Sequence, residues 1–181
     1  MATIFYRLNS QDKIIFVNEE WDLFAIANGG EAVTSARVLY RSIRDFITDL
    51  TTRELYLQIM QRVRHGRSIK FTFRCDSPAF RRLLEMNIHP GEDSSVEYFT
   101  RTLVEERQKY LVLSPTTTAN SDDFLRSCSW CKKIFLDGSW LEVEEAVAQR
   151  QIFHHPFLPP ITHGICEQCY ENMTKVLSNN D

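Results

Sequence analysis

Two pairs of cysteines in the last third of the chain have the type and spacing of metal ligands. Cys128 and Cys131 are separated by two residues, Cys166 and Cys169 likewise, and 34 residues lie between the pairs. A two-residue spacer forms a tight knuckle that directs both sulfur atoms at one centre, so two such pairs can complete a tetrahedral shell. The pattern predicts a structural Zn2+ site made of all four cysteines. Because four thiolates leave no position for water, we expect no metal-based catalysis.

Other chemistry is compatible with the same spacing. Two disulfides can form, but the first residues show no secretory signal, and a reducing compartment disfavours disulfides. A rubredoxin-type iron site and a redox-active dithiol also use such pairs. His163, three residues before Cys166, can replace one cysteine as a ligand. Structural zinc is the interpretation that we prefer.

The residues around the cysteines predict the elements that hold them. Residues 133–143 are expected to form two short strands about Asp137 and Gly138, a dipeptide favoured in tight turns. Residues 167–177 carry acidic side chains early and a lysine late, as a helix dipole prefers. Cys169 would then bind from the first helical turn, where free N–H groups help to hold a thiolate. Knuckle, hairpin and ligand-bearing helix in this order resemble a treble-clef zinc finger.

The chain before the cysteines begins with a predicted hairpin and a helix. Residues 3–8 and 13–17 are rich in β-branched and aromatic side chains, and residues 9–12 between them are turn formers. Asn18 is the expected N-cap of a short helix that is stopped by Asn28, Gly29 and Gly30. Trp21 and the phenylalanines are expected in the core.

A longer helix and a run of strands follow. Residues 42–47 predict one helical turn, and residues 51–54 have the spacing of a capping box that would begin the clearest helix of the chain. Gly66 is expected to end this helix, and its arginines, Arg64 among them, are expected in solvent. The buried stripe should comprise Leu55, Ile59, Met60 and Val63. Strands are expected at 69–75, 82–88 and 96–104, with 110–113 as an extension or a short edge.

Composition sets the broad class of the protein. The chain has 181 residues, 43% of them hydrophobic and 12% aromatic, which is enough for a packed core. No apolar run approaches a membrane span and no targeting peptide is evident, so we expect a soluble, cytoplasmic protein with no membrane contact. Residues 121–181 hold 5 Lys and Arg against 9 Asp and Glu, an acidic balance that disfavours nucleic acid as a partner.

Two strands, several short helices, a longer helix and then three antiparallel strands are the element order of a PAS domain. The run 14–18 followed by a helix resembles the strand-then-Asn signature of that family, and 42–47 resembles the segment before its long helix. The resemblance covers residues 3 to about 113. The cysteine-rich tail, with Trp130 in the first pair and Tyr170 after the second, is similar to short tails attached to bacterial PAS sensor and kinase-related proteins.

These resemblances predict an α+β fold, a PAS-like antiparallel sheet with flanking helices plus a small zinc-binding C-terminal module. The expected divisions are a sensor domain at 1–113, a linker at 114–127, a four-cysteine zinc-finger module at 128–177 and a frayed tail at 178–181. The linker is placed on its turn-forming residues, which lack an apolar period.

The PAS family implies a cup, formed by a curved sheet and the helices across it, that holds a small molecule or presents a face to a partner. The identity of the ligand does not follow from these residues. A flavin-binding light sensor would need an Asn-Cys-Arg motif that is absent, and Cys75 is expected to be a small core residue. His65 is expected to cap the long helix rather than to bind haem. PAS domains commonly pair, so the resemblance also implies a homodimer.

No catalytic signature is present in the chain. It lacks G-x-S-x-G, H-E-x-x-H and a phosphate-binding glycine loop, and His154 and His155 lie among prolines in an expected loop. We therefore expect that the protein is not an enzyme. The resemblances imply a bacterial signal-transduction protein, in which PAS-like sensing of a ligand or partner is coupled to a zinc module that contacts a signalling effector protein. The alternatives are a thiol-based redox or metal sensor, and a DNA-binding regulator, which the acidic balance disfavours.

Overall fold

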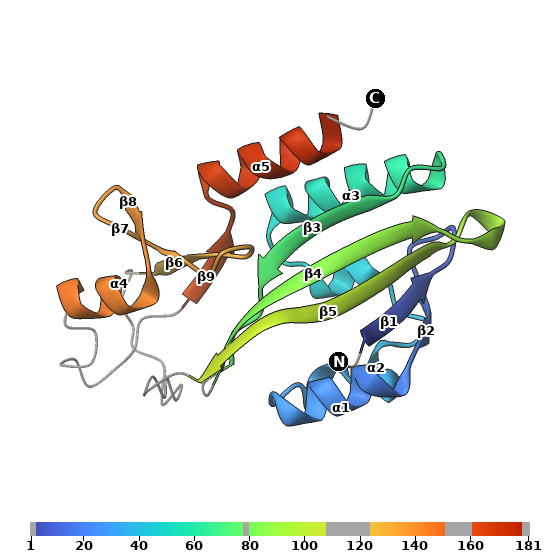
Figure 1. The fold of residues 1–181 in the computed structure, drawn as a ribbon, viewed down its shortest axis with the longest axis horizontal. Coiled ribbons are helices and arrows are strands. Elements are labelled where there is room, and N and C mark those ends of the chain that lie inside the picture. Colours follow the sequence, from blue (N-terminus) through green and yellow to red (C-terminus); the bar gives the residue numbers. More distant parts are fainter. Residues whose placement is uncertain (1–2, 78–79, 108–123, 151–160, 179–181) are drawn as a thin grey trace.

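The computed structural model describes residues 3–77, 80–107, 124–150 and 161–178, which form two sheets with helices around them (Figure 1). The larger sheet has the strand order β2-β1-β5-β4-β3, and every neighbouring pair in it is antiparallel. The smaller sheet has the order β8-β7-β6-β9, in which β6 and β9 are parallel. None of the helices in these ranges is long and apolar enough to cross a membrane.

The first part of the chain follows the predicted element order. Its elements are β1 (Thr3–Leu8), β2 (Ile14–Val17), α1 (Glu19–Ala27), η1 (Glu31–Val33), α2 (Ser35–Val38), η2 (Ile43–Phe46), α3 (Leu50–Arg64), β3 (Ile69–Arg74), β4 (Phe80–Pro90), η3 (Glu92–Ser94) and β5 (Val96–Arg107). The second part contains β6 (Leu125–Cys128), β7 (Ile134–Leu136), β8 (Ser139–Leu141), α4 (Val143–Arg150), β9 (Ile161–Gly164) and α5 (Glu167–Ser178). The predicted fold class is confirmed, because a PAS-like antiparallel sheet with flanking helices is followed by a four-cysteine module.

Asn18 begins α1 as predicted and also ties the helix to the sheet. Its side-chain oxygen accepts a hydrogen bond from the N–H of Trp21 (3.3 Å), as an N-cap does. The same oxygen accepts from the N–H of Phe5 (3.0 Å), and the amide nitrogen donates to the carbonyl of Thr3 (2.8 Å). The Asn18 side chain therefore joins the start of α1 to β1.

The predicted start of α3 is wrong by two residues. Asp49 is the N-cap, and its carboxylate accepts from the N–H of Thr52 (2.7 Å), so the helix begins at Leu50 and Thr51 lies exposed inside its first turn. Asp49 lies two positions before Thr51 and caps the N–H of Thr52, so the helix starts two residues earlier than the capping box predicts. The predicted stripe of Leu55, Ile59, Met60 and Val63 is fully buried, and Gly66 adopts a left-handed conformation just after the C-cap, His65.

A buried carboxylate holds three elements together near the β1–β2 turn. Asp12 is 3% exposed and forms ion pairs with Arg44, at the start of η2, and with Arg64 (2.7 Å), at the end of α3. Arg64 also donates to the carbonyls of Asn9 and Ser94. The expectation that Arg64 is solvated is therefore wrong, because the turn folds back over the helix end.

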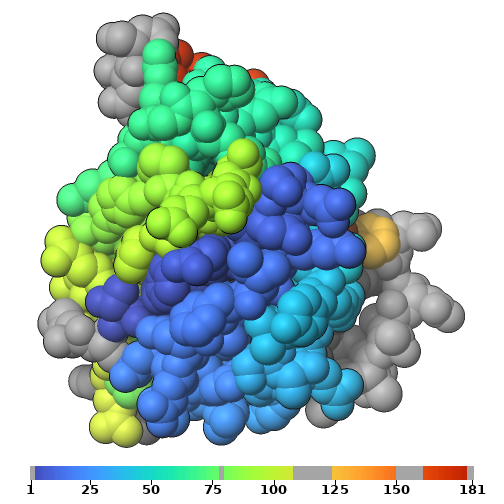
Figure 2. All heavy atoms as spheres, turned by 90° about the vertical axis from the view of Figure 1, so that its right-hand side faces the viewer, coloured from blue at the N-terminus to red at the C-terminus, as the bar shows by residue number. Residues whose placement is uncertain are grey.

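One hydrophobic core spans both parts of the molecule. Tyr6 and Tyr98, opposite each other on β1 and β5, stack in it with ring centroids 4.3 Å apart. Helix α5 lies beside α3 and β3 (Figure 1), and its Met173 and Leu177 are buried in the same core as the stripe of α3. Figure 2 shows the side of the molecule on the right in Figure 1, where the N-terminal segment, the region around the end of α3 and the β4–β5 turn form most of the surface.

Several predicted segments lie outside the described residues. They are the strand at 110–113, the loop with His154 and His155, most of the linker at 114–127 and the last residues of the tail. Within the linker range, residues 125–127 belong to β6, which pairs with β9 and β7.

Candidate metal centre

The four predicted ligands converge on one point. The Sγ atoms of Cys128, Cys131, Cys166 and Cys169 all lie within 4.8 Å of one another, and the sulfur atoms of Cys131 and Cys166 are 3.8 Å apart. Bonds of about 2.3 Å from a tetrahedral zinc ion place its sulfur ligands about 3.8 Å apart. None of the four cysteines is in a disulfide. The cluster thus has the size of a shell around one metal ion.

Strand pairing brings the two halves of the cluster together. Strands β6 and β9 are parallel, with Cys128 opposite Gly164, so the end of β6 lies next to the residues that precede Cys166. The N–H of Ser129 donates to the carbonyl of Gly164 (2.8 Å) and extends this pairing into the knuckle. The predicted hairpin is confirmed, with Asp137 and Gly138 both at positive φ between β7 and β8.

Backbone N–H groups hold the sulfur atoms in place. The N–H of Cys166 donates to Cys128 Sγ (3.4 Å), and the N–H of Cys169 donates to Cys166 Sγ (3.4 Å). Cys166 directly precedes α5 and Cys169 lies in its first turn, as predicted. The knuckle closes through Lys132, which has a φ of 65° and whose N–H donates to the carbonyl of Cys128. Such donors stabilise thiolate sulfur.

Hydrogen bonds between the thiols shift the pKa values of Cys128, Cys131 and Cys169. Hydrogen bonds from Cys131 and Cys169 lower the pKa of Cys128, so its sulfur is the first to ionise. The hydrogen bond to Cys128 raises the pKa of Cys131 to about 11, and it raises the pKa of Cys169 further. One negative charge is therefore favourable without a cation, whereas four thiolates need one to balance their repulsion.

The donor set is compatible with a thiolate-bound metal. Four sulfur donors suit zinc or iron, and zinc bound by four cysteines serves as a cross-link with no open position. His163, the alternative ligand, is exposed on β9 and is not a member of the cluster.

The tip of the first knuckle is inserted into the PAS-like part. Trp130, between the two ligands of that knuckle, is 6% exposed and packs against Tyr56 of α3 (ring centroids 5.7 Å apart) and Phe71 of β3 (5.6 Å). Its carbonyl accepts from the N–H of Arg74 (2.8 Å) at the end of β3. The Arg74 guanidinium also pairs with Glu142, next to β8 (2.8 Å). The packing of Trp130 against α3 and β3 was not predicted from the sequence. The signal for it was a large apolar side chain on an otherwise polar turn between two cysteines.

A cavity of about 410 Å³ lies where the Cys128–Cys131 knuckle meets the PAS-like part of the chain, residues 3–77 and 80–107, which we call the cup. Side chains from β1, η2, α3, β3 and the knuckle line it, among them Tyr6, Phe46, Tyr56, Phe73 and Trp130. Cys75, directly after β3, is half-buried at this cavity rather than in the centre of the core, and burial raises the pKa of its thiol.

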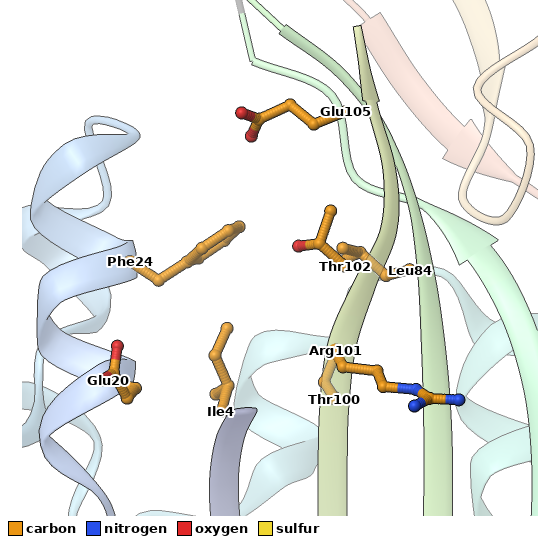
Figure 3. A pocket seen from close by; sticks show the side chains of 8 residues that line it. All are labelled: Ile4, Glu20, Phe24, Leu84, Thr100, Arg101, Thr102 and Glu105. Atoms are coloured by element: carbon orange, nitrogen blue, oxygen red, sulfur yellow. The ribbon is translucent and has the colours of Figure 1, made fainter. Parts of the chain in front are cut away.

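A second hollow, of about 310 Å³, lies between α1 and strands β4 and β5. Figure 3 shows Phe24 and Ile4 turned toward Thr102, with Arg101 turned away. The Glu105 carboxylate at its rim pairs with Arg82 (2.5 Å). The Glu105 carboxylate is thus already engaged in an ion pair within the protein.

No protein-family model and no curated protein matches the chain. Solved structures are similar to part of it. A sensory box sensor histidine kinase from Vibrio cholerae is 12% identical, with 57% of this chain and 84% of that chain covered and a TM-score of 0.41. The PAS domain of nitrogen regulation protein NR(II) from Vibrio parahaemolyticus is 19% identical, with 57% and 91% covered and a TM-score of 0.35.

Proposed function

We propose that this protein is a non-enzymatic signal-transduction module. Its PAS-like cup binds a small molecule or a partner, and its four-cysteine module, cross-linked by structural zinc, is a rigid surface for contact with a signalling protein. The observation that carries the proposal is the burial of Trp130, from the metal knuckle, against Tyr56 and Phe71 of the cup. A change in the cup therefore acts directly on the element that holds two metal ligands.

The bound metal would fix the geometry of the module. When present, zinc supplies a cross-link between the end of β6 and the start of α5. Arg74 then joins the cup to the module through the carbonyl of Trp130 and the carboxylate of Glu142. A ligand shifts this junction only if it binds two arrangements of the cup with different affinity. Four thiolates leave no catalytic position at the metal, so the module is proposed to act by contact with a signalling protein.

The charge of the module supports a protein as the partner rather than nucleic acid. Residues 121–181 hold 9 acidic against 5 basic side chains, and DNA-binding surfaces are usually basic. Glu144, at the start of α4, already pairs with Arg81 of the cup.

The proposal is tested on zinc-loaded protein with a small-molecule library in a thermal-shift assay, together with a pull-down from a bacterial lysate. Each compound that raises the midpoint is then examined by hydrogen–deuterium exchange. We expect slower exchange both in the cup, at β3 and α3, and in the knuckle, where the N–H of Ser129 is bonded to Gly164. If no compound raises the midpoint and no partner is recovered, the sensing function is wrong.

A thiol-based redox sensor is the second candidate, and the half-buried state of Cys131 and Cys169 favours it. Oxidation of a ligand sulfur would release the metal and loosen the knuckle. Peroxide titration with a chromogenic zinc indicator separates the two functions. Release at micromolar peroxide supports the redox sensor, whereas release only at millimolar peroxide supports a structural site.

A further inference from the structure

The cavity between the knuckle and the cup carries two opposite charges that lack an ion-pair partner. Lys132 and Asp49 both line it, and neither side chain forms an ion pair with another of the described residues. The Lys132 ammonium donates to the carbonyl of Ser129 (3.0 Å), and the Asp49 carboxylate accepts from the N–H of Thr52 (2.7 Å). An ammonium has three donors and a carboxylate accepts several hydrogen bonds, so both groups can bind more. Cys75 lines the same cavity, where burial raises the pKa of its thiol and the nearby Lys132 charge opposes that rise.

The remaining Arg, Lys, Asp and Glu side chain of the cavity wall is Arg74, and its charge is balanced within the protein. The guanidinium pairs with the carboxylates of Asp76 and Glu142. Among the described residues that line the cavity, Lys132 and Asp49 are thus one cation and one anion without an ion pair. No ion pair joins these two to each other either. A molecule that carries both charges can bridge them.

Three half-buried aromatic rings provide apolar walls. They are Phe46 of η2, Tyr56 of α3 and Phe73 of β3. Burial raises the pKa of Tyr56 to about 12, so its phenol is neutral at physiological pH. Aromatic rings pack well in offset-stacked or edge-to-face arrangements, so these walls favour a ligand with a ring.

Two other polar atoms beside the cavity are closed to a ligand. The indole nitrogen of Trp130 and the hydroxyl oxygen of Thr52 each expose less than 1 Å² and have no hydrogen-bond partner among the described residues. They have no surface to offer a bound molecule. The charged groups of a ligand therefore have their partners in Lys132 and Asp49.

We propose that this cavity binds a zwitterionic α-amino acid with an aromatic side chain. Its carboxylate pairs with Lys132, its ammonium group pairs with Asp49, and its ring packs among Phe46, Tyr56 and Phe73. Both pairs are charge-assisted hydrogen bonds, which are stronger than neutral ones. The volume of about 410 Å³ lies in the usual range for small-molecule sites. The inference deepens the proposed sensing function and rests on it, and it places a knuckle residue in the binding site.

The test compares four probes on the zinc-loaded full chain by ligand-detected NMR titration. L-Phenylalanine carries both charges and a ring, 3-phenylpropanoate lacks the ammonium group, 2-phenylethylamine lacks the carboxylate, and L-alanine lacks the ring. The dissociation constant of L-phenylalanine should be about 5- to 10-fold lower than that of either singly charged probe, because each of these loses one charge-assisted hydrogen bond. L-Alanine should bind more weakly than L-phenylalanine by at least about 10-fold, since it leaves the aromatic walls uncovered.

Two variants assign each charge of the ligand to its partner. Asp49→Asn keeps a side chain that caps a helix and removes the negative charge. It should weaken L-phenylalanine and 2-phenylethylamine about 5-fold and leave 3-phenylpropanoate unchanged. Lys132→Met should weaken L-phenylalanine and 3-phenylpropanoate by a similar factor and leave 2-phenylethylamine unchanged. A general distortion of the cavity would not produce this crossed pattern.

Asp45→Asn and Lys133→Met are the matched controls. Asp45 lies four residues before Asp49 and Lys133 directly follows Lys132, but neither lines the cavity, so both variants should bind all probes as the wild type does. The proposal is overturned if L-phenylalanine does not bind, if it binds no tighter than the singly charged probes, or if Asp49→Asn and Lys132→Met weaken every probe equally. If the thermal-shift screen instead finds a ligand of another class, this inference is wrong while the sensing function stands.

Discussion

Replacement of Trp130 tests how tightly the Cys128–Cys131 knuckle is anchored in the cup. Its indole is almost fully buried against Tyr56 and Phe71, so Trp130→Ala should lower the free energy of unfolding by about 3–5 kcal/mol, the usual cost of removing a buried aromatic side chain. Trp140→Ala is the control. Trp140 is only half-buried, against Phe135, and should cost about 1–2 kcal/mol, including its hydrogen bond to Glu167.

Trp130→Phe separates the packing of the ring from the unpartnered N–H. The smaller ring leaves a void that costs about 1–2 kcal/mol, but the variant also removes a buried donor whose lack of a partner costs about 1–3 kcal/mol. The two effects nearly cancel, so the net change should stay within about 1 kcal/mol. The large loss should therefore appear in the alanine variant alone.

The assay is urea unfolding followed by circular dichroism, with free zinc at the same excess for every protein. If Trp130→Ala costs no more than Trp140→Ala, the knuckle is not anchored in the cup. A loss in Trp130→Phe as large as in Trp130→Ala would mean that the indole nitrogen has a partner in the free protein.

Three further changes test a helix cap, a buried ion pair and a carboxylate of the large sheet. Asp49→Ala should destabilise the protein by about 1 kcal/mol, because Asp49 caps α3, whereas Thr51→Ala should have almost no effect; urea midpoints compare them. Asp12→Asn should cost about 3 kcal/mol in the same assay, since it leaves Arg64 without its buried partner. Hydrogen bonds, that from Lys70 foremost, lower the pKa of Glu85 from 4.5 to about 2. The stabilisation from Glu85 is thus complete above pH 4.5 and is lost as the pH falls through about 2, so the stability advantage of wild type over Glu85→Gln should shrink in that range.

Each of these changes has a result that would contradict the reasoning. Equal losses in Asp49→Ala and Thr51→Ala would restore the capping box as the start of α3. A neutral Asp12→Asn variant would show that the carboxylate is not needed to join the turn to the helix. A wild-type advantage over Glu85→Gln that is constant from about pH 5 to about pH 2 would mean that Glu85 is not held ionised; metal loss in acid affects both proteins and does not enter the comparison.

The elements that sequence reasoning predicted correctly depend on local chemistry. Asn18 accepts from an amide three residues ahead, Asp137 and Gly138 close a two-residue turn, and the stripe of α3 repeats at helical spacing. Each pattern lies within a short stretch of the chain, so neighbouring residues specify it. The convergence of the cysteine pairs was also predictable, because the knuckle spacing constrains each half of the cluster.

The contacts that sequence reasoning missed join residues far apart in the chain. Asp12 and Arg64 are 52 positions apart, and neither residue type indicates that the other is its partner. The parallel pairing of β6 with β9 and the insertion of Trp130 between α3 and β3 depend in the same way on tertiary packing. Asp49 was missed for a different reason, because two residue types that favour N-caps lie two positions apart and only the folded chain decides between them.

Zinc K-edge X-ray absorption of the purified full chain tests the metal centre most directly. The convergence of four sulfur atoms within 4.8 Å predicts one zinc ion per chain with four sulfur neighbours at about 2.3 Å. A chain purified with zinc in every buffer that still contains no bound metal, or a shell that includes nitrogen or oxygen ligands, would contradict a centre made of Cys128, Cys131, Cys166 and Cys169.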